Sequence, residues 1–210
     1  MNKGLFITFE GVEGAGKSSQ IDLLKKEFEK KGIDYIVTRE PGGTPIGEKI
    51  RAVLLDPENK EMNYITELLL YYSSRAQHLY EKIMYAKNQG KIVICDRYSD
   101  STMAYQGYGR GIDINLIQQL NKIVEKENVP DLTFVIDIAP EISLERAKRK
   151  SGNVGDRLEQ ESLEFHNKVR EGFIQIAKNN PDRVKIIDGK KSIEEIQKEI
   201  LEKIIVKMEG

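Results

Sequence analysis

Short apolar runs alternate along this chain with longer amphipathic segments. The short runs are rich in β-branched and aromatic residues, which favour buried strands. We expect strands at residues 5–10, 35–38, 91–95, 132–136 and 184–187. The longer segments carry apolar residues at three- and four-residue spacing, which is typical of helices. We expect helices at residues 17–31, 61–88, 114–127, 141–150, 160–178 and 193–207. The alternation indicates βαβ units, and therefore an α/β fold with a doubly wound five-stranded parallel sheet surrounded by helices.

The length and charge of the chain restrict what it can bind. Its 210 residues fit a single domain, residues 1–210, and no repeat or linker divides them. The 33 basic and 34 acidic residues nearly cancel, and no long run of like charge occurs. We therefore expect no nucleic acid polymer as partner, and instead a small anion held in a local basic pocket.

The chain shows no segment suited to a membrane or to secretion. The apolar run at residues 5–9 is too short for a signal peptide, and no run approaches the roughly 20 apolar residues of a membrane helix. The one cysteine, Cys95, lies in an apolar run and is expected to be a buried small residue. We expect a cytoplasmic protein without a membrane partner.

A glycine-rich motif directly follows the first expected strand and precedes a helical pattern. It reads Gly-Val-Glu-Gly-Ala-Gly-Lys-Ser over residues 11–18, which is the P-loop spacing in its required strand–loop–helix context. Such a loop points its backbone N–H groups at a polyphosphate, and the helix N-terminus adds positive charge. A glycine-rich turn without a ligand is the weaker alternative. The residues expected to bind ATP are Gly11, Val12, Glu13, Gly14, Ala15, Gly16, Lys17, Ser18 and Ser19.

Within this loop, two residues have specific expected roles. Lys17 would reach the phosphate that is transferred, and the hydroxyl of Ser18 would bind Mg²⁺. The motif identifies a user of nucleoside triphosphate, but it does not identify the acceptor.

Three arginines indicate a second phosphate-bearing ligand. Arg39 and Arg97 each follow the carboxyl end of an expected strand, on the same edge as the loop, and Arg75 lies on an expected helix. Guanidinium groups bind phosphate bidentately and stay ionised. Each arginine alone is more often a solvated surface charge, so their shared placement carries the inference.

The chain also resembles the thymidylate kinase family over nearly its full length. Six blocks in the expected order and spacing carry the resemblance: residues 11–18, 39–44, 74–78, 96–98, 104–111 and 156–161. The resemblance implies transfer of phosphate from ATP to dTMP, with Mg²⁺ as cofactor, in a P-loop NTPase-type fold that forms a homodimer.

The resemblance further implies individual roles at the acceptor site. Arg39, Arg75 and Arg97 would contact the thymidylate, Arg39 and Arg97 chiefly at its phosphate. Gln106 would read the edge of the thymine ring with Thr102 nearby, and Tyr71 would stack on the base.

Three further residues are assigned less directly. Glu13 resembles a contact to the nucleotide sugar or its metal, and Asp96 a carboxylate that organises Mg²⁺. Tyr105 is expected among the substrate-binding residues, although it could simply pack a glycine-containing turn.

The source of the catalytic arginine divides the family. Some members carry it in the P-loop, where this chain has Ala15, and others carry it on a lid. In this chain a basic cluster over residues 146–150 precedes Gly152. The resemblance is therefore to the lid-arginine class, with a flexible lid at about residues 146–157. We expect Lys17, Arg97 and Arg149 to be catalytic, with Arg146 as the alternative to Arg149. By default such a cluster is a solvated helix end.

Two other functions compete with this reading. Another nucleoside monophosphate or deoxynucleoside kinase would differ only around the base pocket. A GTPase-type switch would need an Asn-Lys-x-Asp segment, which the chain lacks. For His78 and His166, without partners at metal-ligand spacing, we expect surface or helix-packing roles.

Overall fold

The computed structural model describes residues 4–151 and 155–209. At its centre lies a parallel sheet of five strands in the order β2-β3-β1-β4-β5. The strands confirm the five predicted from sequence and are β1 (Phe6–Glu10), β2 (Tyr35–Arg39), β3 (Ile92–Asp96), β4 (Leu132–Asp137) and β5 (Val184–Asp188).

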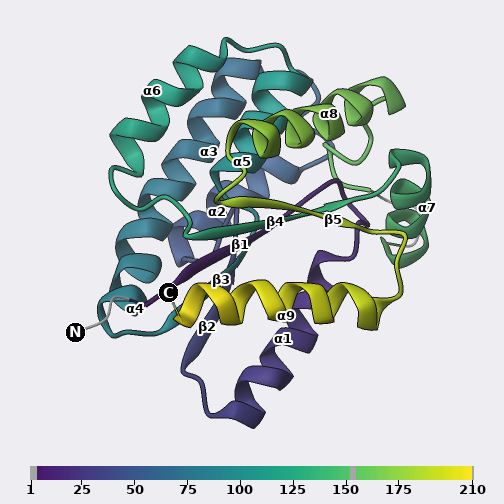
Figure 1. The fold of residues 1–210 in the computed structure, drawn as a ribbon. Helices are drawn as coiled ribbons and strands as arrows, with labels where there is room; N and C mark the ends of the chain where they lie inside the picture. The colour runs from purple at the N-terminus through teal and green to yellow at the C-terminus, as the bar shows by residue number, and fades with distance from the viewer. Residues whose placement is uncertain (1–3, 152–154, 210) are drawn as a thin grey trace.

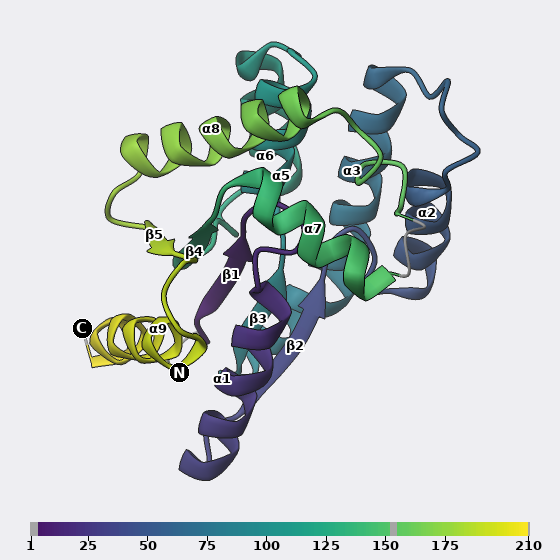
Figure 2. The same ribbon diagram turned by 90° about the vertical axis from the view of Figure 1, so that its right-hand side faces the viewer.

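Helices follow the strands and cover both faces of the sheet. They are α1 (Lys17–Lys31), α2 (Pro45–Leu55), α3 (Tyr64–His78), α4 (Met84–Asn88), α5 (Ser99–Thr102), α6 (Ile114–Val124), α7 (Pro140–Ser151), α8 (Leu163–Asn179) and α9 (Ile193–Glu209), with π-helical segments η1 (Leu79–Ile83) and η2 (Met103–Gly109). Helices α1 and α9 lie on one face, and α3, α5 and α8 lie on the other (Figures 1 and 2). The doubly wound α/β fold is therefore confirmed.

Strand β1 shows how the two cores share one sheet. Ile7 and Phe9 pack in a cluster with α1 and α9, whereas Phe6 packs with η1 and α4 on the opposite face. Thr8 and Glu10 lie on the Phe6 face because side chains alternate along a strand. Both are fully buried, and the Thr8 hydroxyl lies 2.7 Å from that of Thr133 on β4. Glu10 is therefore held at the carboxyl end of the central strand.

Helix α2 was not predicted from sequence. It begins after Thr44, whose hydroxyl accepts a hydrogen bond from the Gly47 N–H at 3.0 Å, and Pro45 occupies its first turn. These are strong N-terminal signals. The helix was missed for two reasons. The preceding Pro41-Gly42-Gly43 run is typical of a loop, and few residues of this eleven-residue helix are buried.

Residues 105–108 were expected to form a glycine-containing turn, and this was wrong. Residues 99–109 are helical through α5 and η2. A Cβ atom on Gly107 would lie 2.5 Å from Ile114 Cδ1, and one on Gly109 would lie 2.6 Å from Phe165 Cε2. These glycines permit close packing of η2 against α6 and α8 rather than a turn.

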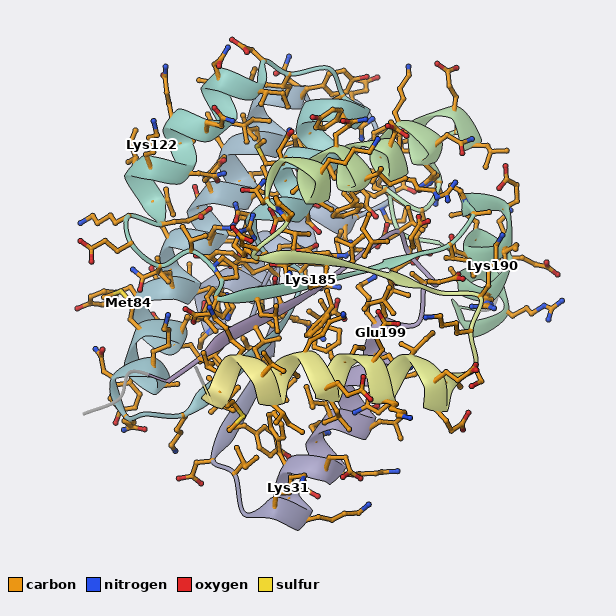
Figure 3. All side chains as sticks on the ribbon, viewed as in Figure 1. Lys31, Met84, Lys122, Lys185, Lys190 and Glu199 are labelled. Carbon is orange, nitrogen blue, oxygen red and sulfur yellow. The ribbon has the colours of Figure 1, made fainter. Side chains whose placement is uncertain are left out.

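Charged side chains lie on the outside of the molecule. Charged side chains such as Lys31 and Lys122 extend away from the outer helices (Figure 3). No helix in residues 4–151 and 155–209 is long and apolar enough to cross a membrane. Cys95 is fully buried, as predicted.

Candidate active site

The glycine-rich loop joins β1 to α1 at the carboxyl edge of the sheet. Gly11, Gly14 and Gly16 adopt φ angles of 131°, 75° and 105°, which L side chains rarely adopt. A Cβ atom on Gly14 would lie 2.0 Å from the Ser143 carbonyl oxygen of α7. The glycines are therefore required both for the curvature of the loop and for the approach of α7.

Lys17 is the first residue of α1, and its side chain reaches back to the loop. Its Nζ donates to the carbonyl oxygens of Val12 at 3.2 Å and Gly11 at 3.4 Å, and the side chain is 5 % exposed. Burial lowers the pKa of Lys17, and the nearby charge of Arg97 lowers it further. An anion in the loop would restore a counter-charge to this ammonium group.

A pocket beside the loop collects most of the residues predicted to bind the acceptor. We call it the arginine pocket, and its lining includes Arg51, Tyr71, Arg75, Arg97, Thr102, Tyr105 and Gln106. A second pocket, the loop pocket, is lined by residues 13–20 together with Arg146 and Lys191. Glu13 and Glu159 line both pockets. The two pockets therefore meet beside the glycine-rich loop.

Arg97 links the loop to the arginine pocket. Its NH1 donates to the Gly11 carbonyl oxygen at 2.7 Å, and its NH2 donates to Glu13 Oε2 at 2.8 Å. The guanidinium carbon lies 5.1 Å from the centre of the Tyr105 ring. Arg97 adopts a φ of 70°, which is uncommon outside glycine and costs conformational energy. The surrounding contacts must therefore hold this turn in place.

Glu10 provides those contacts. Its Oε1 accepts the Tyr98 N–H at 2.7 Å, and its Oε2 accepts the Ser101 hydroxyl at 2.5 Å. Burial raises the pKa of Glu10 to about 8, with the charge of Asp100 adding to the effect. Sequence reasoning missed Glu10, because it reads as the polar end of an apolar strand.

Arg75 is the largest fully buried side chain of the pocket. Its Nε donates to Glu40 Oε2 at 2.8 Å, and its NH2 donates to Thr102 Oγ1 at 2.9 Å. The guanidinium lies between the rings of Tyr72 and Tyr98, 5.3 and 5.0 Å from their centres. Its NH1 is buried and has no hydrogen-bond partner among the described residues. That nitrogen is therefore a donor available to a ligand.

Arg39 and Arg51 occupy different places. Arg39 is exposed, and its NH2 donates to Glu48 at 3.1 Å. It lines a groove that also contains Ser18 and Asp96, outside the arginine pocket. Arg51 of α2 lines the arginine pocket and donates to the Pro41 carbonyl oxygen at 2.8 Å. The predicted contact of Arg39 with a phosphate stays a prediction, and Arg51 is a residue that sequence reasoning missed.

The two predicted metal ligands share the groove that Arg39 lines. Ser18 and Asp96 both line it, and Asp96 Oδ1 is buried without a hydrogen-bond partner among the described residues. An unpaired buried carboxylate oxygen in the same groove as a hydroxyl fits Mg²⁺, which prefers oxygen ligands and retains waters and phosphate oxygens. The described residues contain no cluster of three or more acidic, histidine or cysteine ligands, so phosphates would supply the remaining ligands.

Helix α7 carries the predicted lid arginines. Arg146 lines the loop pocket. The Arg149 side chain is 77 % exposed and pairs with Glu145 at 2.5 Å. The remainder of the predicted lid includes residues 152–154, which lie outside the described residues. The roles of both arginines stay predictions.

Both histidines are buried, so the surface alternative was wrong. His78 Nε2 lies 2.6 Å from Thr38 Oγ1, and its Nδ1 lies 2.9 Å from Glu40 Oε1. His78 thus packs in the network that holds Arg75, and His166 lines the arginine pocket.

Comparison with known proteins agrees with this geometry. The family model described as "Thymidylate kinase" matches residues 9–200. The chain belongs to the thymidylate kinase family.

Individual members of the thymidylate kinase family match almost end to end. The protein from Halothermothrix orenii is 51 % identical over 203 residues, covering 96 % of this chain and 97 % of that protein. The one from Symbiobacterium thermophilum is 46 % identical over 196 residues, covering 93 % and 90 %. The crystal structure of thymidylate kinase from Ehrlichia chaffeensis superposes with a TM-score of 0.77 at 37 % identity, covering 96 % of this chain and 98 % of that one.

The buried carboxyl group of Glu10 should make stability depend on pH. An unfolded chain releases this proton near pH 4.5, whereas the folded chain retains it to about pH 8. The folded state thus binds more protons in this window, so stability falls as pH rises through it, by up to about 1.4 kcal/mol per pH unit. We expect Glu10→Gln to flatten urea-unfolding free energies measured from pH 5 to 9. The exposed control Glu202→Gln should keep the slope of the unmodified chain, and an unchanged slope in Glu10→Gln would contradict the assignment.

Proposed function

We propose that this chain transfers the γ-phosphoryl group of ATP to the phosphate of dTMP, giving ADP and dTDP. The observation that carries the proposal is the junction of the two pockets. A phosphate-binding loop opens beside a pocket whose walls combine arginines with base-sized aromatic and amide groups, and Glu13 and Glu159 line both. Membership in the thymidylate kinase family supports the same conclusion.

The reaction needs alignment and charge neutralisation more than covalent help. An oxygen of the dTMP phosphate forms a bond to the γ-phosphorus as the bond to the β,γ-bridging oxygen breaks, and the electron pair leaves with ADP. Lys17 lies in the loop that would hold the ATP phosphates, and Arg97 lies between that loop and the arginine pocket. The two cations would offset the negative charge that brings two phosphates together.

Mg²⁺ would be held by Ser18 and Asp96, and when bound it supplies further positive charge to the ATP phosphates. Within the arginine pocket, Arg51 and Arg97 are suited to the dTMP phosphate. Tyr71 would stack on the base, and Arg75, Thr102 and Gln106 would meet its polar edge. Arg39 would act from the groove that holds the metal ligands.

We also propose a homodimer formed through α2 and α3. Ile46 and Val53 of α2 and Ile65 and Leu69 of α3 are between 46 % and 50 % exposed. These apolar side chains lie on neighbouring helices away from the two pockets, where a second copy could cover them. A molar mass in solution equal to the 24.0 kDa of one chain would contradict this proposal.

A coupled ADP-release assay with a panel of monophosphates tests the function. We expect turnover with dTMP and Mg-ATP, and much less with dGMP, dAMP or dCMP. Lys17→Ala should lower kcat by on the order of 10²–10³-fold or more, because the loop loses its cation, while the melting temperature is retained. The exposed control Lys26→Ala on α1 should leave turnover unchanged. Preference for a different monophosphate would favour another kinase of this type.

Matched substitutions of Arg51 and Arg39 test which arginine binds the acceptor phosphate. We expect Arg51→Met to raise KM for dTMP by roughly ten- to a hundred-fold, because a charge-assisted hydrogen bond is worth about 1.5–3 kcal/mol. Arg39→Met should raise KM less, since its side chain faces Glu48 outside the pocket. Steady-state kinetics at saturating ATP measure both, and the opposite order would favour the assignment from sequence.

Arg146 and Arg149 form a second matched pair. A lid arginine that stabilises the transition state lowers kcat when removed, with little change in dTMP binding. Because Arg146 already lines the loop pocket, we expect Arg146→Ala to lower kcat by about 10³-fold. Arg149→Ala should have a smaller effect. The reverse order would assign the role to Arg149 and require that the lid moves.

A further inference from the structure

Glu67 is a fully buried carboxylate in the first turn of α3, outside the arginine pocket. Its Oε1 accepts from Gln106 Nε2 at 2.8 Å and from Arg110 Nε at 3.3 Å. Its Oε2 accepts from Arg110 NH2 at 3.2 Å and forms an ion pair with Arg157 NH1, 2.6 Å away. All the hydrogen-bond and ion-pair partners of this carboxylate among the described residues therefore present N–H groups to it.

The two arginines keep Glu67 ionised. Burial alone would raise the pKa of Glu67, but the hydrogen bonds from Arg110 and Gln106 and the charges of Arg110 and Arg157 outweigh burial and lower it. Arg157 is itself fixed, since its Nε donates to the Leu54 carbonyl oxygen at 2.8 Å. An ionised carboxylate has no proton to give and can only accept.

This restricts the Gln106 side chain to one orientation. An amide has a donor end and an acceptor end, and only the NH₂ end can face an ionised carboxylate. Gln106 is 1 % exposed and lines the arginine pocket, and no described donor reaches its Oε1. The amide oxygen is therefore the atom left for a ligand.

We propose that Glu67 is a positioning residue for base specificity, which fixes the Gln106 amide so that one pocket presents both this acceptor and the Arg75 donor. This inference rests on the proposed function, because it concerns the base of the monophosphate acceptor.

The resulting pattern selects one kind of pyrimidine. Arg75 NH1 is a buried donor without a partner among the described residues, and Gln106 Oε1 is an acceptor. Thymine presents the complementary edge, with an acceptor at O4 and a donor at N3–H. Cytosine presents a donor at N4 and an acceptor at N3, so both contacts would be mismatched and left unpaired.

The test compares dTMP with 5-methyl-deoxycytidine monophosphate, which keeps the sugar, phosphate and methyl group. In Glu67→Gln the new side chain can donate as well as accept, so the Gln106 amide can turn over. We expect the ratio of kcat/KM for dTMP to that for the cytosine analogue to fall by about ten-fold or more. A purely structural role would lower kcat/KM for both substrates equally and leave the ratio unchanged, which would overturn the inference.

Two further variants separate this role from damage to the buried ion pairs. Glu161→Gln removes the ion pair of Glu161 with Arg110 NH1 at 2.6 Å but keeps every contact of Glu67, so the ratio should stay as in the unmodified chain. A fall as large as in Glu67→Gln would overturn the inference. Gln106→Leu leaves Glu67 paired with both arginines, and its ratio should fall at least as far; it decides the question if Glu67→Gln does not fold. An unmodified chain without activity on dTMP would instead contradict the proposed function.

Discussion

The Arg97 guanidinium joins the two pockets of the site. It donates to the Gly11 carbonyl oxygen in the loop and to Glu13, and it lies over the Tyr105 ring of the arginine pocket. Its backbone has a positive φ, and buried Glu10 holds the following turn through Tyr98 and Ser101. Because this one partly buried cation contacts both sides, neither pocket can shift relative to the other without losing these contacts.

Periodicity and local signals were enough for the sheet but not for every helix. All five strands were predicted within one or two residues, because a parallel sheet buried on both faces requires continuous apolar runs. Helix α2 and the helical segment at residues 99–109 were not predicted. In both segments, glycines precede or interrupt the apolar pattern. Gly107 is required because a Cβ atom there would collide with Ile114 and Ile117, and the sequence alone does not predict this contact. Contacts between elements decide such positions.

The residues of the candidate site also fall into those that local sequence predicts and those that depend on contacts between elements. The strand–loop–helix arrangement of the glycine-rich loop was predicted because its glycines, lysine and serine lie close together in the chain. Arg51 was missed because α2 was not predicted. Without the helix, the direction in which its side chain points cannot be assigned. Arg39 follows a strand end as expected, but Glu48 turns its side chain toward the groove with Ser18 and Asp96. Position along the chain predicted the correct edge of the sheet, but not the direction of the side chain.

Three residues of the arginine pocket, or the turn that carries them, are held by a buried carboxyl group. Glu40 holds Arg75, Glu67 holds Gln106, and Glu10 holds the turn of Arg97. Buried ionic groups gain little net stability, because desolvation offsets their attraction. The effect of Glu40 and Glu67 is directional: each accepts from its partner, and this leaves Arg75 NH1 and Gln106 Oε1 as the atoms without a described partner. The acceptor pocket is thus organised before a nucleotide enters, which lowers the entropic cost of ordering these side chains on binding. Arg149 differs from these groups: its described ion pair, with Glu145, is exposed on both sides, and such a pair contributes little to holding a side chain in place.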